Sequence, residues 1–95
     1  MTPGDRIAGA RFPLGQLVNP PAATERLTSE EIADGIIRHA RGDWGDIGTG
    51  DAAENERSLR EGFRLLSAHG RGDRRFWVIT EADRSATTVL LPEDY

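Results

Sequence analysis

Four carboxylates in the middle of the chain could hold a divalent metal ion. Asp43, Asp46 and Asp51 lie in a glycine-rich stretch, and Glu54 follows three positions later. Magnesium and calcium bind several carboxylate oxygens in a small space, so one interpretation is a small metal-dependent hydrolase or nuclease. The spacing does not match the alternating acids of an EF-hand loop, and Asp and Gly are also ordinary turn residues. Turn and capping roles are therefore favoured, and we expect no metal and no cofactor.

His39 and His69, the two histidines, are the candidates for acid–base chemistry. A general base needs a nucleophile or an acid within hydrogen-bond reach. Ser67 is two residues from His69, so both side chains point to one face of a strand. No nucleophile-elbow motif surrounds this serine, and His39 lies at the edge of an apolar helical stripe. We expect structural roles for both histidines and no catalytic residue.

Trp44 lies in the polar sequence GDWGD. A tryptophan in such a loop either fills the core or stands exposed as an anchor for a partner, and the core role is favoured. In the second case Asp43 and Asp46, beside the ring, form a docking patch for a basic protein surface and steer its approach. Trp44→Ala separates the two roles.

The polar segment 81–85 separates the two most apolar runs of the chain. Its length fits a hairpin loop, and Asp83 and Ser85 can close the turn through their own backbone. If Arg84 serves closure alone, its replacement by alanine should change stability by less than ~1 kcal/mol. The alternative is an outward contact surface made of Glu81, Asp83 and Arg84.

Charge is distributed unevenly along the chain. The net charge is −4, and all twelve basic residues are arginines. Residues 30–56 contain eight acidic residues against two arginines, a net −6, whereas residues 57–75 contain six arginines against two acids, a net +4. This layout favours solvated, partly neutralised helix faces. A low pI disfavours indiscriminate nucleic-acid binding, although the 57–75 arginines leave a DNA-binding regulator as an alternative.

Two helices are predicted. Thr28 and Glu31 have the spacing of a capping box, and Gly42 is a natural stop, which places a helix at about 29–41. Its apolar stripe comprises Ile32, Ala33, Ile36, Ile37 and Ala40. A second helix is expected to begin near Asp51, the predicted cap. Its buried stripe comprises Ala52, Leu59, Phe63 and Leu66.

The last third of the chain predicts three consecutive antiparallel strands, at about 64–69, 74–80 and 86–91. The run 11–18 contains proline and glycine and is at best a short edge strand. Residues 1–95 are therefore expected to form one α+β domain, in which an antiparallel sheet of three or four strands packs against two helices. Residues 1–10 are expected to be loosely ordered.

The strand at 76–80 is apolar on both of its faces. Phe76 and Val78 point to one face, and Trp77 and Ile79 point to the other. Such a strand is covered on both sides, and two helices cover only one. The N-terminal segment covers the other face, or a second copy does so in a homodimer that buries roughly 1,200 Å² or more. Thr87 and Thr88 also alternate, so one of them is expected on the solvent side.

The composition limits the cellular compartment and the kinds of site that can be expected. Cysteine is absent, which removes disulfides and cysteine-ligated metals. No apolar run approaches the ~20 residues needed to cross a bilayer, and the N-terminus does not read as a signal peptide. A cytoplasmic protein without membrane contact is expected.

Four segments resemble a group of short bacterial proteins found on plasmids and other mobile elements. They are RFPLGQLV (11–18), GDWGD (42–46), EGFRLLSAH (61–69) and above all FWVITEADRSATTVLLPEDY (76–95). The resemblance transfers no catalytic residue. It implies a function in conflict with the host, because small acidic proteins of mobile elements are often anti-CRISPR or anti-restriction inhibitors. We therefore expect a non-enzymatic accessory protein that binds a host or element-encoded protein, such as a defence nuclease complex.

Overall fold

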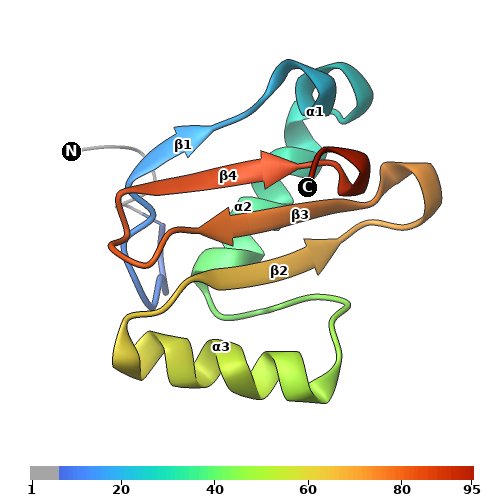
Figure 1. Ribbon diagram of the computed structural model, residues 1–95. Helices are drawn as coiled ribbons and strands as arrows, with labels where there is room; N and C mark the ends of the chain where they lie inside the picture. The colour runs from blue at the N-terminus through green and yellow to red at the C-terminus, as the bar shows by residue number, and fades with distance from the viewer. Residues whose placement is uncertain (1–6) are drawn as a thin grey trace.

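The computed structural model describes residues 7–95, which form an α+β fold (Figure 1). The elements, in chain order, are β1 (Gln16–Val18), α1 (Pro21–Arg26), α2 (Ser29–Ala40), α3 (Thr49–Glu61), β2 (Leu65–His69), β3 (Phe76–Thr80) and β4 (Ala86–Leu90). Short 3-10 turns at Gly72–Arg74 and Pro92–Asp94 follow β2 and β4. Among these residues no helix has the length and apolar character needed to cross a membrane.

The sheet has four strands in the order β1-β4-β3-β2. The meander of β2, β3 and β4 is antiparallel, as predicted, but β1 pairs with β4 in parallel. The sheet is therefore mixed, and the expectation of a purely antiparallel sheet was wrong. After β1 the three helices carry the chain to the opposite edge of the sheet, where β2 lies, and the β2–β3–β4 meander then brings β4 beside β1 in the parallel direction. Parallel strands need a long connection of this kind.

Helix α2 lies against one face of the sheet, behind the strands in Figure 1. Its start is the predicted capping box, in which the Thr28 hydroxyl accepts from the Glu31 N–H and the Glu31 carboxylate accepts from the Thr28 N–H. Gly35 faces the strands, and a Cβ there would lie 2.5 Å from the Phe76 ring. This glycine therefore lets the helix approach β3 closely.

The other helices differ from the prediction in detail. Helix α1 occupies part of the stretch expected to be a linker, with proline at its first position, where the missing N–H is not needed. Helix α3 begins at Thr49 with Gly48 as its cap, so Asp51 lies in the first turn and is not the cap. Phe63 is 49% exposed and does not belong to the buried stripe. Polar residues, Asn55 and Ser58, are instead the buried positions of α3.

The outer edge of β2 is covered by side-chain and loop contacts. The Asn55 side chain donates to the Leu66 carbonyl (2.6 Å) and accepts from the Leu66 N–H (3.2 Å). Further along, Ala68 exchanges backbone hydrogen bonds with Trp44 and Asp46. Gly45 makes this close approach possible, since a Cβ there would lie 1.9 Å from the Ala68 carbonyl oxygen. An unpaired strand edge is a template for aggregation, and here it is satisfied internally.

The core lies between α2 and the sheet. Phe12 and Leu14 from the N-terminal segment are buried in it together with Ile32, Ile36, Phe76, Val78 and Val89. Residues 7–10 are tied to α2, because Arg11 N–H donates to the Ala40 carbonyl and Arg41 donates to the Ala8 carbonyl. The expectation that residues 1–10 are loosely ordered stays a prediction, and residues 1–6 lie outside the described part.

Candidate functional site

The face of the sheet opposite α2 is the broadest candidate surface. Strand register aligns Val18, Thr88, Ile79 and Leu66 in one row across all four strands. A second row contains Leu90, Trp77 and Ala68. We call these seven residues the open face. None of the helices within residues 7–95 lies over it, and it faces the viewer in Figure 1.

Aromatic and basic side chains lie across the open face. The rings of Trp77 and Tyr95 are 6.1 Å apart, and the Arg64 guanidinium donates to the Tyr95 hydroxyl at 2.9 Å. Arg75 lies 5.5 Å from the centre of the Trp77 ring, a cation–π geometry. Tyr95 is 63% exposed, whereas Ile79 at the centre is 3% exposed. The described N-terminal residues pack on the α2 side instead. The accessible part of this face is formed by Val18 and by the part-exposed residues Leu66, Trp77, Thr88 and Leu90, whereas Ile79 and Ala68 are buried.

The acidic loop is neutralised by arginines. Arg38 donates to Asp43 at 2.8 Å, and Arg75 donates to Asp46 at 2.9 Å. These bonds lower the pKa of both carboxyls. Both aspartates are exposed, but each is matched by a cation, so the predicted acidic docking patch has little excess charge.

Trp44 lies in the core and is 6% exposed. Its ring stacks on Phe12 with centroids 6.3 Å apart and meets His39 edge-on at 5.7 Å. The indole N–H donates to the Glu56 carboxylate at 3.0 Å. The core role is therefore confirmed. The inclusion of Trp44 among the partner-binding residues is corrected, because its ring has no surface to offer.

Comparison of the chain with protein-family models, curated proteins and solved structures finds no match. The candidate sites are therefore weighed by their geometry alone.

Three of the four carboxylates of the metal interpretation contact different arginines. Asp43 and Asp46 bond different arginines, and Glu54 lies 3.9 Å from Arg57 on its own helix. Within residues 7–95 there is no group of three or more His, Asp or Glu side chains arranged to hold a metal ion. The geometry gives the metal-dependent hydrolase no support.

The Arg84 side chain connects the β3–β4 turn to the end of α3 through hydrogen bonds. Its guanidinium donates to the carbonyls of Phe63 (2.7 Å) and Ser58 (3.0 Å), and also to two carbonyls of its own turn. It also lies 5.8 Å from the centre of the Phe12 ring. The outward-facing alternative for Arg84 is corrected. Glu81 is exposed, and Asp83 closes the turn by accepting from the Ser85 N–H at 3.0 Å.

Replacement of Arg84 is expected to cost more than the sequence suggested. Arg84→Ala leaves the carbonyls of Phe63 and Ser58 without their charged donor, and a hydrogen bond to a charged group contributes about 1.5–3 kcal/mol. We expect a loss of about 2–3 kcal/mol in urea unfolding. Arg84→Lys keeps the charge but not the planar fork, so it should recover only part of the loss. If Arg84→Ala lowers the free energy of unfolding by less than ~1 kcal/mol, the Arg84 hydrogen bonds contribute no more than a surface ion pair does.

The arginines of 57–75 do not form one basic surface. Five of the six bond other groups: Arg57 to Glu61, Arg60 to the Glu56 carbonyl, Arg64 to Tyr95, Arg74 to Glu31 and Arg75 to Asp46. Arg71 is the exception within the described residues. Partly compensated charges on several elements give little support to a DNA-binding surface, which needs a continuous basic face.

A chain of buried polar side chains links the two histidines. His39 Nδ1 and Ser67 Oγ are 2.6 Å apart, and Ser67 Oγ is 2.9 Å from His69 Nε2. On the other side His39 Nε2 is 2.9 Å from Thr80 Oγ1, which is 2.7 Å from Thr87 Oγ1. The Thr87 hydroxyl donates to the Leu14 carbonyl at 2.7 Å. We call these five side chains the polar chain, and each is at most 3% exposed.

Burial determines the protonation state of the two histidines in the polar chain. Desolvation, with smaller contributions from His69 and Arg84, lowers the pKa of His39 to about 3. Desolvation and the Arg38 charge lower the pKa of His69 to about 4, against the opposing effect of Asp43 and nearby Asp34. Both imidazoles are thus neutral at pH 7. Ser67 is enclosed in the core, so this Ser–His arrangement cannot reach a substrate, and a structural role for both histidines fits the geometry.

Sequence reasoning placed the histidines but missed Thr80 and Thr87 as their partners. A signal was present, because the alternation that buries Val78 also buries Thr80, two positions later. Thr87 is buried and Thr88 faces the open side, which confirms the expected alternation.

Proposed function

We propose that this chain is a non-enzymatic binding protein that captures a partner protein with the open face of its sheet. The observation that carries the proposal is the row Val18–Thr88–Ile79–Leu66, which crosses four strands without a helix over it. Val18, Thr88 and Leu66 are the accessible residues of this row, and Ile79 between them is buried. Exposed apolar groups rimmed by polar ones are typical of protein interaction sites. Trp77 and Tyr95 belong to the residue types enriched at binding hot spots, as are the neighbouring arginines.

The resemblance to mobile-element proteins supplies the proposed context. The partner is then a host or element-encoded protein of the cytoplasm, such as a defence nuclease complex, and capture inhibits it. Binding would be the whole activity, since the Ser67 hydroxyl and both histidines lie in the interior. The open face replaces the acidic loop as the proposed contact surface, because Asp43 and Asp46 are already paired with arginines.

Thr88→Arg tests the proposal at the centre of the open face. Thr88 is part-exposed and flanked by Val18 and Ile79, so a long cation there blocks an apolar partner while the strand is retained. We expect capture of the partner from bacterial lysate to fall at least about tenfold, the loss typical of a hot-spot position. Ala53→Arg, on the exposed side of α3, is the matched control and should capture normally.

Light scattering of the free protein at high micromolar concentration shows whether the open face binds a different protein or a second copy of the chain. A monomer is expected if the partner is a different protein. A dimer that Thr88→Arg dissociates would instead assign the face to a second copy of the chain. Equal capture by wild type, Thr88→Arg and Ala53→Arg would contradict the open face as the contact surface.

A further inference from the structure

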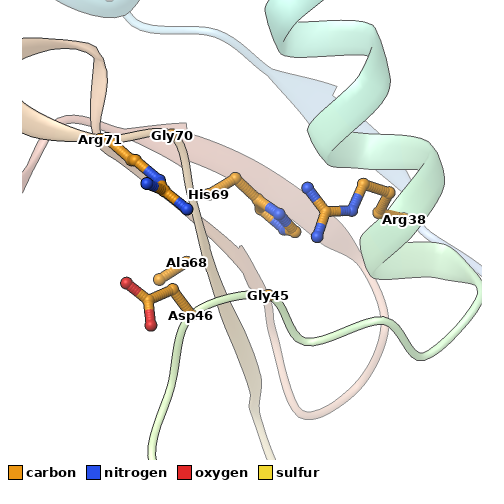
Figure 2. A pocket seen from close by; sticks show the side chains of 7 residues that line it. All are labelled: Arg38, Gly45, Asp46, Ala68, His69, Gly70 and Arg71. Atoms are coloured by element: carbon orange, nitrogen blue, oxygen red, sulfur yellow. The ribbon is translucent and has the colours of Figure 1, made fainter.

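A surface cleft of about 610 Å³ lies where β2 ends. Its lining residues are Arg38, Gly45, Asp46, Ala68, His69, Gly70 and Arg71. Figure 2 shows the side chains of Arg38 and Arg71 extending toward His69 from opposite sides, with the loop of Gly45 and Asp46 beside them. The cleft thus combines two guanidinium groups with an imidazole, and Ala68 is the one residue that it shares with the open face.

The polar chain fixes which atoms carry hydrogens. A carbonyl oxygen only accepts, so Thr87 donates its hydroxyl hydrogen to Leu14, and Thr80 must donate to Thr87. The hydrogen between Thr80 and His39 therefore comes from His39 Nε2. A neutral imidazole carries one hydrogen, so His39 Nδ1 accepts from Ser67. The Ser67 oxygen in turn accepts from His69 Nε2.

This order leaves His69 Nδ1 with a lone pair and no donor. The atom has less than 1 Å² of exposed surface and no hydrogen-bond partner within the described residues. Gly45 passes in front of it, since a Cβ on that residue would lie 2.9 Å from Nδ1. Buried acceptors without a donor are rare and point to a missing partner. A ligand group can reach Nδ1 only if the Gly45 backbone moves aside, which requires the hydrogen bonds of Ala68 with Trp44 and Asp46 to open.

The charges around the cleft select the ligand. Arg38 is engaged by Asp43, and the Asp46 carboxylate is engaged by Arg75. The Arg71 side chain forms no hydrogen bond or salt bridge within residues 7–95, although its charge helps to lower the pKa of Asp46. Its donors therefore remain available to a ligand. The ligand must therefore place a negative charge at Arg71 and a hydrogen-bond donor at His69, which line the same cleft.

We infer that the cleft binds a phosphoryl group that retains one acidic hydrogen, with hydrogen phosphate as its simplest form. The P–OH group donates to His69 Nδ1, and the remaining oxygens accept from Arg71 and from the outer N–H groups of Arg38. Guanidinium groups match phosphate geometry through paired donors. Sulfate has the same shape and negative charge but carries no hydrogen at neutral pH, so the bare acceptor discriminates against it.

Titration of the purified protein with inorganic phosphate and with sulfate tests the inference, and a long-range ¹H–¹⁵N imidazole spectrum reports His69. Without anion, the spectrum should show a bare lone pair at Nδ1 and hydrogen on Nε2. Phosphate should shift the Nδ1 resonance and bind at least about tenfold more tightly than sulfate, the discrimination expected from one charge-assisted hydrogen bond. Glycerol 3-phosphate at pH 6, where half of its phosphoryl groups keep a hydrogen, separates a phosphomonoester source from free phosphate.

Arg71→Ala is the matching variant, since Arg71 is exposed and bonds nothing in the described fold. It should weaken phosphate binding about tenfold while the circular dichroism spectrum is unchanged. Arg60→Ala, on the exposed surface of α3, should bind phosphate as the wild type does. Equal binding of phosphate and sulfate would mean an adventitious ion only. An Nδ1 resonance that is already hydrogen-bonded and does not respond to phosphate would mean that water fills the position, which also overturns the inference.

Discussion

Acidification from pH 7.5 to pH 4.5 is expected to remove about 3 kcal/mol of the free energy of unfolding through His39 alone. Burial holds the pKa of this histidine at about 3, against 6.5 when exposed. The folded protein therefore binds fewer protons than the unfolded chain between these values, and stability falls as the pH falls, by about 1.4 kcal/mol per unit. His69, with a pKa of about 4, adds a loss in the same direction.

Between pH 7.5 and pH 4.5 the change in the free energy of unfolding comes mainly from the histidines and not from the carboxylates. The strongest carboxylate shift is that of Glu31, whose pKa Arg74 and the Thr28 backbone lower to about 2. Its stabilising contribution is present above pH 4.5 and is lost only as the pH falls below that value. Urea unfolding, followed by the fluorescence of Trp44 and Trp77, measures the stability at each pH.

His39→Gln tests whether His39 causes this pH dependence. The quantity compared is the slope of the free energy of unfolding against pH, not the free energy itself. Glutamine does not titrate, so the pH dependence between 6.5 and 4.5 should become shallower by about 1.4 kcal/mol per unit. This holds even if the variant is less stable overall. Stability that stays flat from pH 7.5 to 4.5 in the wild-type protein would show that the imidazoles are charged or hydrated in the fold.

The sequence allowed the local elements to be predicted where one physical signal dominates. The Thr28–Glu31 spacing located the start of α2, because the capping box depends on nearest neighbours alone. Alternation located β3 and placed Trp77 on the face opposite that of Phe76 and Val78. These features need no knowledge of distant parts of the chain.

Contacts between segments distant in sequence could not be predicted in this way. The parallel pairing of β1 with β4 depends on how three helices return the chain to the sheet. Arg84 was expected at the surface because hairpin turns are exposed, but α3 ends beside this turn and offers its carbonyls. The polar chain depends on strand register that brings Thr80 opposite Thr87. In each case the partner lies on another element, and local pattern carries no information about it.

The candidate site shows the same division between local and distant information. Alternation placed Trp77 and Ile79 on one face of the strand and Phe76 and Val78 on the other, but it did not indicate which of the two faces α2 covers. The acidic loop presents less negative charge than its own sequence indicates. The arginines that pair with it, Arg38 and Arg75, lie on α2 and immediately before β3. Charge counted along a segment therefore overstates the charge that a folded surface presents.

Trp44→Ala is expected to lower the free energy of unfolding by about 3–5 kcal/mol, the range for truncating a large buried aromatic residue. The ring packs against Phe12 and His39, and its N–H bonds Glu56, so alanine leaves a cavity and removes one of the donors to a carboxylate that Arg11 also bonds. Trp44→Phe keeps an aromatic ring against Phe12 and loses mainly the hydrogen bond. It should therefore cost less than alanine does in the same urea titration.

The Asp43→Asn, Asp46→Asn double variant separates the core role of Trp44 from the charge of its loop. Both aspartates pair with arginines at the surface, where an ion pair contributes about 0–1 kcal/mol, so the fold should be kept. If the open face is the contact surface, this variant should bind the partner at the wild-type rate even at low salt, whereas Trp44→Ala should lose binding only in proportion to the unfolded fraction. Slower association of the double variant, with a weaker salt dependence, would instead return the acidic loop to the interface, because charges that steer an encounter act on the association rate.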